Sequence, residues 1–206
     1  MNASGFAVSD AVAADIAAMG KFAADRGWVP ATSGNFSSRV DDRHIAITRS
    51  GVDKGKLVRD DVVMLCLDEA IPPGVSAETP LHVARYRAAP GIGAIMHVHS
   101  VSSTVLSRMH ARQGFVELRG YEMLKALEGV TTHDETLSLP VFANSQDTAA
   151  LSLIIEERLG ASKVPGYLLA GHGMYAWGAN ADQARRHLDG LEFMLACALE
   201  EWRLQR

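Results

Sequence analysis

The chain has 206 residues, of which 48% are hydrophobic, and a formal net charge of −4 at pH 7. This length predicts one domain, 1–206, with a substantial core. The acidic balance argues against nucleic acid as a partner, and no apolar run approaches the roughly 20 residues that a membrane span needs. The first residues lack the pattern of a signal peptide and the two cysteines are expected to be free thiols, so we expect a cytoplasmic protein.

The first third of the chain predicts a helix followed by strands. Apolar residues at helical spacing predict a helix over about 10–26, ended by Gly27. Two short strands at 36–40 and 45–48, joined by a polar turn, predict a hairpin. The segment 62–67 is apolar throughout, which is typical of a central strand buried on both faces.

A polar loop follows the predicted hairpin. It carries Ser50, Gly51 and Lys54, and a small polar segment with Asn35 precedes the first strand of the hairpin. Main-chain N–H groups, a hydroxyl and an ammonium at a strand end suit an anion. An ordinary polar loop explains the same residues and is preferred on this pattern alone.

The next helix is predicted over about 79–89, with Thr79 as its N-cap and Pro80 at its first position. Glu78 therefore lies at a helix N-terminus, where an anion is favoured. Helix-end electrostatics alone would account for this glutamate.

Two histidines lie at the end of the following apolar strand. His97 and His99 are two residues apart, and alternate residues of a strand share a face. Imidazole is the commonest metal ligand, so the pair predicts half of a metal site. The alternative is that one or both are hydrogen-bonded core histidines.

The remainder alternates between helices and short strands. Helices are predicted at about 102–109 and 147–159, and strands at 115–118 and 139–142, the last of edge type because it contains Pro140. Glu122 starts a short helical piece between these strands. From composition alone, Glu122 is expected to be a solvent-exposed charged residue on this helical piece.

The segment 167–177 consists of two apolar strands separated by Gly171-His172-Gly173. Glycines on both sides let the backbone turn and let the imidazole approach a shared centre. His172 is thus the candidate third metal ligand beside His97 and His99. A long helix follows to about residue 202, and the mixture of hairpins and helices predicts an α/β sandwich with a mixed sheet.

With these pieces in place, the chain resembles the class II aldolase/adducin family along nearly its whole length. The resemblance rests on segments that occur in the family's order and spacing: Thr32-Ser33-Gly34-Asn35-Phe36-Ser37, Ile47-Thr48-Arg49-Ser50-Gly51, Glu78, His97-Val98-His99-Ser100 and Gly171-His172-Gly173.

The resemblance implies a three-layer α/β/α fold with a central mixed, largely antiparallel sheet. It also implies a homotetramer with active sites near subunit interfaces. It further implies one Zn²⁺, or a similar divalent ion, per subunit on His97, His99 and His172. A non-catalytic, adducin-like interaction module is the other class to consider, and the three histidines argue against it.

Within the family, the segment Glu122-Met123-Leu124-Lys125 resembles a dehydratase subfamily of methionine salvage. In that subfamily a glutamate of this segment is the acid/base, a role that transfers to Glu122. The aldolases of the family use the equivalent of Glu78. The residues assigned to phosphate and substrate binding are Asn35, Ser50, Gly51, Lys54 and Ser76.

The resemblance implies a phosphorylated ketose as substrate, with a metal ion that stabilises an enediolate. A dehydratase would then expel the C4 hydroxyl of a methylthio-substituted ketose phosphate. The alternative is a sugar-phosphate aldolase or epimerase that breaks the C3–C4 bond of a fuculose, rhamnulose or ribulose phosphate. The three histidines do not separate these reactions, and the choice of dehydration depends on Glu122.

Overall fold

The computed structural model describes residues 7–160 and 162–205. This part of the chain contains five α-helices and eight β-strands, with short 3₁₀ turns between some of them. The helices are α1 Asp10–Asp25, α2 Thr79–Ala88, α3 Val101–Met109, α4 Thr148–Leu159 and α5 Ala181–Leu204. The strands are β1 Asn35–Arg39, β2 His44–Thr48, β3 Val62–Cys66, β4 Ala94–Val98, β5 Phe115–Arg119, β6 Thr136–Phe142, β7 Gly166–Leu169 and β8 Gly173–Gly178.

Four of the five described α-helices, all except α2, start at a short polar side chain that caps them. Ser9 accepts a hydrogen bond from the N–H of Val12 at the start of α1. Asp147 and Asn180 cap α4 and α5 in the same way. Each of these side chains satisfies one of the backbone donors that the first turn of a helix leaves unpaired.

The eight strands form one sheet in the order β3-β2-β1-β4-β8-β7-β6-β5. Neighbouring strands are antiparallel except for β6 and β7, which are parallel. The predicted mixed, largely antiparallel sheet is therefore confirmed. β4 lies near the middle, between β1 and β8, so the His97 strand is covered on both edges.

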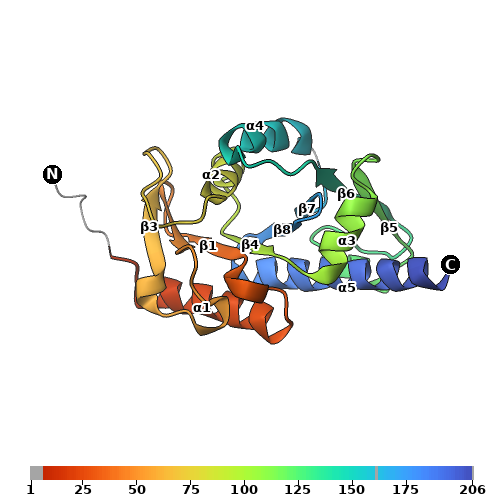
Figure 1. Ribbon diagram of the computed structural model, residues 1–206, viewed down its shortest axis with the longest axis horizontal. Helices are drawn as coiled ribbons and strands as arrows, with labels where there is room; N and C mark the ends of the chain where they lie inside the picture. The colour runs from red at the N-terminus through yellow and green to blue at the C-terminus, as the bar shows by residue number, and fades with distance from the viewer. Residues whose placement is uncertain (1–6, 161, 206) are drawn as a thin grey trace.

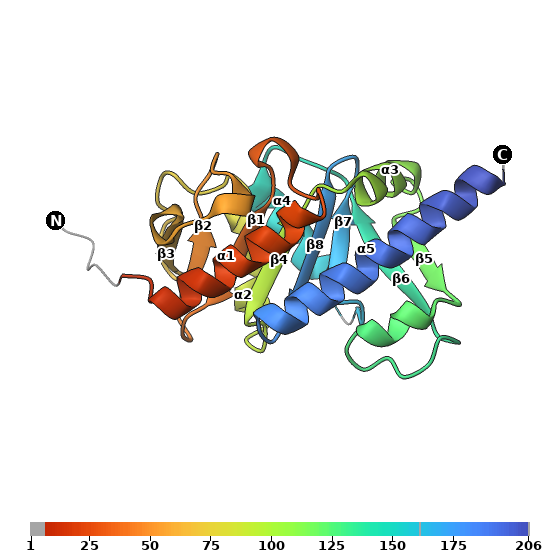
Figure 2. The ribbon, with the colours of Figure 1, turned by 90° about the horizontal axis from the view of Figure 1, so that it is seen from below.

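Helices cover both faces of this sheet, which makes the predicted three-layer α/β/α arrangement. Figure 1 shows α2 and α4 on one side of the strands and α1 and α5 on the other, and α3 packs against α5. In Figure 2, α1 and α5 run across the strands. The apolar side chains fall into two clusters, one on each face of the sheet, because alternate residues of each strand point to opposite faces.

Two strand assignments from the sequence are wrong in position. β3 is an edge strand and not a central one, because it pairs with β2 alone. Its residues still face apolar clusters on both sides, with Val62 in one and Leu65 in the other. A strand that is apolar throughout indicates that both of its faces are buried. Helices can cover both faces of an edge strand as well as those of a central strand.

β6 is an interior strand although it contains Pro140. The strand pairs with β5 up to Pro140 and with β7 from Val141 onward. The proline therefore lies where the strand changes its partner. The loss of one N–H donor is tolerated at such a place.

Among the described residues, no helix is both long and apolar enough to cross a bilayer. Cys66 and Cys197 are free thiols, as expected from the sequence.

Candidate active site

Strand β4 carries the buried member of the histidine cluster. His97 is fully buried, and its ring stacks on Tyr175 of the neighbouring strand β8, with 4.0 Å between ring centroids. Its Nδ1 donates to the carbonyl oxygen of Met174 over 3.1 Å. The proton on Nδ1 leaves the Nε2 lone pair directed at the cluster.

His99 follows the end of β4, where the backbone leaves the sheet. Its main-chain N–H donates to the carbonyl of Trp28 over 2.8 Å. Its Nε2 lies 2.8 Å from Nε2 of His97. The two-residue spacing thus brings both imidazoles to one point, as the sequence predicts.

His172 reaches the same point from the turn between β7 and β8. Gly171 has a φ of 68°, which favours glycine. A Cβ on Gly173 would lie 2.1 Å from the carbonyl oxygen of Val98, so only glycine lets the turn pack against β4. The ring nitrogen Nδ1 of His172 donates to the side-chain oxygen of Asn144 over 3.3 Å.

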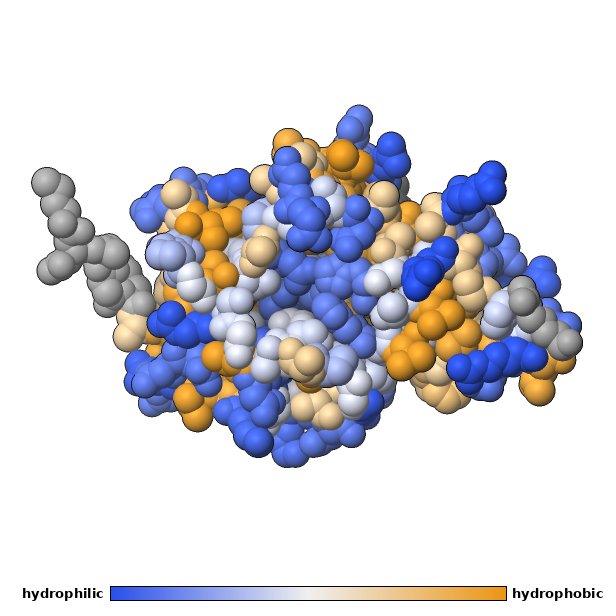
Figure 3. All heavy atoms as spheres, viewed as in Figure 1, coloured by the Kyte–Doolittle hydropathy of each residue, from blue (hydrophilic) through white to orange (hydrophobic). Residues whose placement is uncertain are grey.

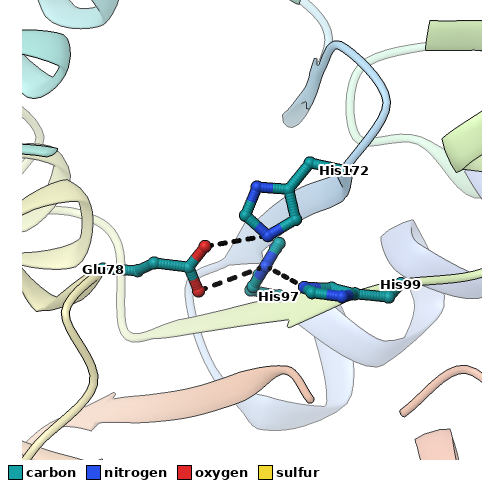
Figure 4. Close-up of side chains that lie close together, drawn as sticks. All are labelled: Glu78, His97, His99 and His172. Carbon is teal, nitrogen blue, oxygen red and sulfur yellow. Dashed lines mark hydrogen bonds and ion pairs between the residues drawn. The ribbon is translucent and has the colours of Figure 1, made fainter. Parts of the chain in front are cut away.

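Glu78 completes the cluster from the start of α2. Its carboxylate oxygens lie 2.9 Å from Nε2 of His172 and 3.3 Å from Nε2 of His97. Figure 4 shows the glutamate and the three imidazoles facing one another. One ligand atom from each of the four residues lies within 4.8 Å of the others.

Burial and charge set the protonation of this cluster. Burial lowers the pKa of His97 to about 3 and that of His99 to about 4, so both rings are neutral at pH 7. Burial opposes ionisation of Glu78, but the neighbouring imidazoles and a hydrogen bond from Asn35 outweigh it. They hold the pKa of this carboxyl well below its usual range.

This donor set fits a divalent cation. The Nε2 atoms of His97 and His99 lie 2.8 Å apart, so they can share either a proton or a bound cation. Three imidazoles leave a further coordination position for a substrate oxygen, as catalytic metal sites require. The cluster of Glu78, His97, His99 and His172 can therefore bind a metal ion.

A small cavity of about 280 Å³ opens beside His172 and Glu78. Ser50 and Ser76, two of the predicted phosphate ligands, line it together with Asn144. Figure 3 shows hydrophilic side chains in the middle of the face of the molecule that Figure 1 also presents. The cavity is at the small end of ligand pockets, which suits a compact phosphorylated substrate.

Asn35 lies behind this cavity and is buried. Its side-chain amide donates to Glu78 over 2.7 Å and to the hydroxyl of Ser76 over 3.2 Å. Gly51 follows Ser50 on the exposed turn with a φ of 75°. The structure thus brings four of the five predicted phosphate residues to the same region: Asn35, Ser50, Gly51 and Ser76.

Lys54 requires a correction. Its side chain is buried, and its ammonium donates to the carbonyls of Thr32 and Val52 over 3.0 and 2.8 Å. Burial also lowers the pKa of this ammonium. Lys54 therefore supports the loops around β1 and does not serve as the predicted phosphate ligand.

Glu122 is not part of the cluster within one chain. It begins the 3₁₀ turn Glu122–Ala126, its side chain is 70% exposed, and it forms ion pairs with Lys125 and His133. Its pKa is lowered, first by the hydrogen bond from Lys125. It borders a different cavity, beside Phe193 of α5.

Asn144 is a site residue that the sequence does not identify, since it lies in a polar stretch just before the predicted helix at 147–159. It follows β6, and His172 follows β7. Because these two strands are parallel, their carboxyl ends meet at one edge of the sheet. Asn144 is brought to the site by the order of the strands in the sheet, which cannot be predicted from residues close together in one sequence.

The family described as "Class II Aldolase and Adducin N-terminal domain" matches residues 14–199. The chain belongs to the class II aldolase/adducin family. A methylthioribulose-1-phosphate dehydratase of Parvibaculum lavamentivorans is 51% identical over 90% of this chain and 92% of its own. A second protein of that name, from Stenotrophomonas maltophilia, is 50% identical over 88% of this chain and 86% of its own.

Solved structures of class II aldolases share the fold. An L-fuculose-1-phosphate aldolase of Thermus thermophilus is 28% identical, with a TM-score of 0.76 over 95% of this chain and 97% of its own. Another structure named L-fuculose 1-phosphate aldolase is 21% identical, with a TM-score of 0.79 over 97% of this chain and 90% of its own. This class II aldolase/adducin chain is thus similar over its length both to dehydratases and to aldolases.

Proposed function

We propose that this class II aldolase/adducin chain is a methylthioribulose-1-phosphate dehydratase, a metal-dependent hydro-lyase of methionine salvage in the cytoplasm. The observation that carries the proposal is the identity of about 50%, over most of both chains, to proteins of that name. The Glu78 and three-histidine cluster supplies a site for the metal that such a lyase needs. The two free thiols agree with a reducing compartment.

The proposed reaction removes water from C3 and C4 of 5-methylthioribulose 1-phosphate. A proton leaves C3, the C4–O bond breaks, and the C4 oxygen departs as water after it gains a proton. The resulting enol loses the proton of its C3 hydroxyl, takes up a proton at C4 and becomes 2,3-diketo-5-methylthiopentyl 1-phosphate. The atoms lost by the substrate are those of one water molecule.

His97, His99 and His172 would hold the cation, which we propose to be Zn²⁺, one per subunit. When bound, this ion acts as a Lewis acid toward the substrate carbonyl and makes the C3 proton more acidic. The hydrogen bonds from His97 to Met174 and from His172 to Asn144 keep the Nε2 atoms directed at it.

Glu122 is the proposed acid/base that moves the proton between C3, C4 and water. Because its carboxylate lies away from the cluster in its own chain, the role requires Glu122 of a neighbouring subunit. The exposed side chain of Phe193 beside it and the open cavity of about 840 Å³ support an interface there. We therefore also propose a homotetramer with its active sites near subunit interfaces.

Ser50, Gly51 and Ser76 are the proposed phosphate ligands. Ser50 and Ser76 line the cavity beside Glu78, and Gly51 continues the turn from Ser50. Hydroxyl and main-chain N–H donors suit a phosphate dianion. Asn35 holds Ser76 and Glu78 in place by its two donor hydrogens.

The alternative is a sugar-phosphate aldolase or epimerase. It is favoured by the 28% identity and matching fold of the Thermus thermophilus L-fuculose-1-phosphate aldolase. The same cluster serves both reactions, because both begin with an anion beside the substrate carbonyl.

A substrate panel tests the choice. The purified, zinc-loaded protein is offered 5-methylthioribulose, fuculose, rhamnulose and ribulose phosphates, with a chelator-treated sample as control. We expect water loss to the diketone from the first substrate alone, and about one metal ion per chain. Triose phosphate from any of the substrates, without diketone, would make the aldolase the better assignment. Full activity of the chelated, metal-free protein would contradict both.

A further inference from the structure

A chain of buried hydrogen bonds leads away from Glu78 into the layer between the sheet and α2. Asn35 donates to Glu78, and the amide oxygen of Asn35 lies 2.5 Å from Nε2 of His82. Nδ1 of His82 lies 2.7 Å from the hydroxyl of Ser37, which lies 3.0 Å from that of Tyr86. Apart from Glu78, the residues joined by these hydrogen bonds are each at most 2% exposed: Asn35, His82, Ser37 and Tyr86. We call these five residues the Glu78–Tyr86 ladder.

The ladder follows from two sequence periods. Asn35 and Ser37 are two apart on β1, so they point to one face of the sheet. Glu78, the N-cap of α2, and the helix residues His82 and Tyr86 are spaced four residues apart, so they lie on one stripe. The two rows interleave where α2 packs on β1, and each strand residue bridges two helix residues.

The ionised carboxylate of Glu78 sets the direction of every bond. A carboxylate only accepts, so Asn35 must present its NH₂ group to Glu78 and its oxygen to His82. His82 must then carry its proton on Nε2, and its bare Nδ1 accepts from Ser37. Ser37 in turn accepts from the phenol of Tyr86. Burial lowers the pKa of His82 to about 4, against the opposing charge of Glu78, so this ring is neutral at pH 7.

The opposite orientation of Asn35 is excluded by the same geometry. Its oxygen would lie 2.7 Å from a carboxylate oxygen of Glu78, with no proton between two acceptors. A buried pair of that kind costs several times what a normal hydrogen bond contributes. The donor on His82 is thus what keeps the Asn35 oxygen satisfied while its NH₂ group faces the site.

We propose that His82 is a positioning residue for catalysis: its Nε2–H holds Asn35 with both amide hydrogens directed at Glu78 and Ser76. Through Asn35 the ladder keeps the Glu78 carboxylate aimed at the three imidazoles and the Ser76 hydroxyl aimed at the substrate cavity. His82 itself touches neither the cavity nor the cluster. This role rests on the proposed function, since it assumes that turnover needs Glu78 and Ser76 in these places.

The position of the proton on His82 is the first test, and it needs no substrate. The zinc-loaded protein, labelled with ¹⁵N in its histidines, is studied by NMR at pH 7, and the His82→Gln spectrum identifies the His82 signals. We expect one neutral form with the proton on Nε2. A proton on Nδ1, or a mixture of both forms, would overturn the proposal. This result is independent of whether the protein dehydrates methylthioribulose 1-phosphate.

Turnover of variants is the second test, with whichever phosphorylated ketose the wild type converts. His82→Leu removes the donor, and we expect kcat to fall about tenfold or more while zinc stays bound. His82→Gln offers an N–H near the Nε2 position and should recover most of the loss. Ser152→Ala, which removes a buried hydroxyl bonded within α4, is the matched control and should keep wild-type kcat.

A merely structural role gives a different pattern. His82→Leu would then melt at a lower temperature, yet its folded, zinc-loaded fraction would keep wild-type kcat, and that result overturns the proposal. If His82→Leu does not fold, the tautomer of the wild type and the turnover of His82→Gln decide. An inactive but folded His82→Gln with bound zinc would also count against the positioning role.

Discussion

Each imidazole of the cluster is oriented by the group that its second nitrogen contacts. His97 donates to a main-chain carbonyl of β8, which substitution does not remove. His172 instead depends on the side chain of Asn144. The orientation of His172 is therefore the part of the metal site that a single side chain outside the cluster controls.

Asn144→Ala should weaken metal binding by about 10- to 100-fold, because the Nδ1 proton of His172 loses its acceptor and the ring can rotate. The measurement is a zinc titration against a chromophoric chelator. Ser145→Ala is the matched control, since its hydroxyl bonds to the N–H of Asp147 and to no imidazole. An unchanged zinc affinity in Asn144→Ala would show that the turn at His172 alone fixes the ring.

The packing of β8 against β4 fixes the position of the turn that carries His172. Gly173→Ala would put a methyl group against the carbonyl of Val98, so β8 must shift away from β4. We expect a loss of about 1–3 kcal/mol in the free energy of unfolding, together with weaker zinc binding. Gly91→Ala, which meets open space, should be neutral in denaturant unfolding. Equal stability of the two variants would refute the packing argument.

A buried carboxyl joins two elements close to the site. Glu192 of α5 accepts hydrogen bonds from Ser100 and Ser102 over 2.6 and 2.9 Å at the start of α3. Its other oxygen has no hydrogen-bond partner among the described residues. Burial outweighs the hydroxyl donors and raises the pKa of Glu192 to about 7.

This shift predicts a pH-dependent stability. Between the ordinary pKa of a glutamate and about 7, the folded protein binds more protons than the unfolded chain, so stability falls as pH rises. We expect the wild type to lose on the order of 1–3 kcal/mol between pH 5 and 8 relative to Glu192→Gln. Denaturant unfolding of both proteins at the two pH values measures the difference. Parallel curves would mean that Glu192 stays ionised.

The sequence was sufficient to predict the helices and strands and the three converging histidines, because these features depend on residues that are close together in the chain. The spacing of His97 and His99 and the glycines beside His172 predict side chains that converge, and the structure brings them together. Strand order is not local, so β3 is misplaced by the sequence and Asn144 is missed. Lys54 is misread because a lysine in a polar loop does not reveal whether its ammonium faces an anion or carbonyls.

At the scale of the whole molecule, the site of one chain is incomplete for the proposed reaction. The histidine cluster and the Glu122 turn lie on different parts of the chain surface and border different cavities. Across an interface of a symmetric oligomer, a residue of one subunit can contact a different residue of its neighbour, so the Glu122 of one subunit can reach the cluster of another. The oligomer would then be part of the catalytic machinery.

Mixed oligomers test this arrangement. His97→Ala removes a metal ligand and Glu122→Gln removes the acid/base while the cluster stays intact, so each variant alone should be inactive. If Glu122 acts across an interface, a hybrid that contains both variants pairs some intact clusters with an intact Glu122. Random mixing should then restore about a quarter of wild-type activity, because a site needs one native contribution from each of two subunits. The assay is turnover after co-expression, with native mass spectrometry to verify the hybrids. Hybrids without activity would place the function of Glu122 within its own subunit or exclude it, and would return the acid/base role to Glu78.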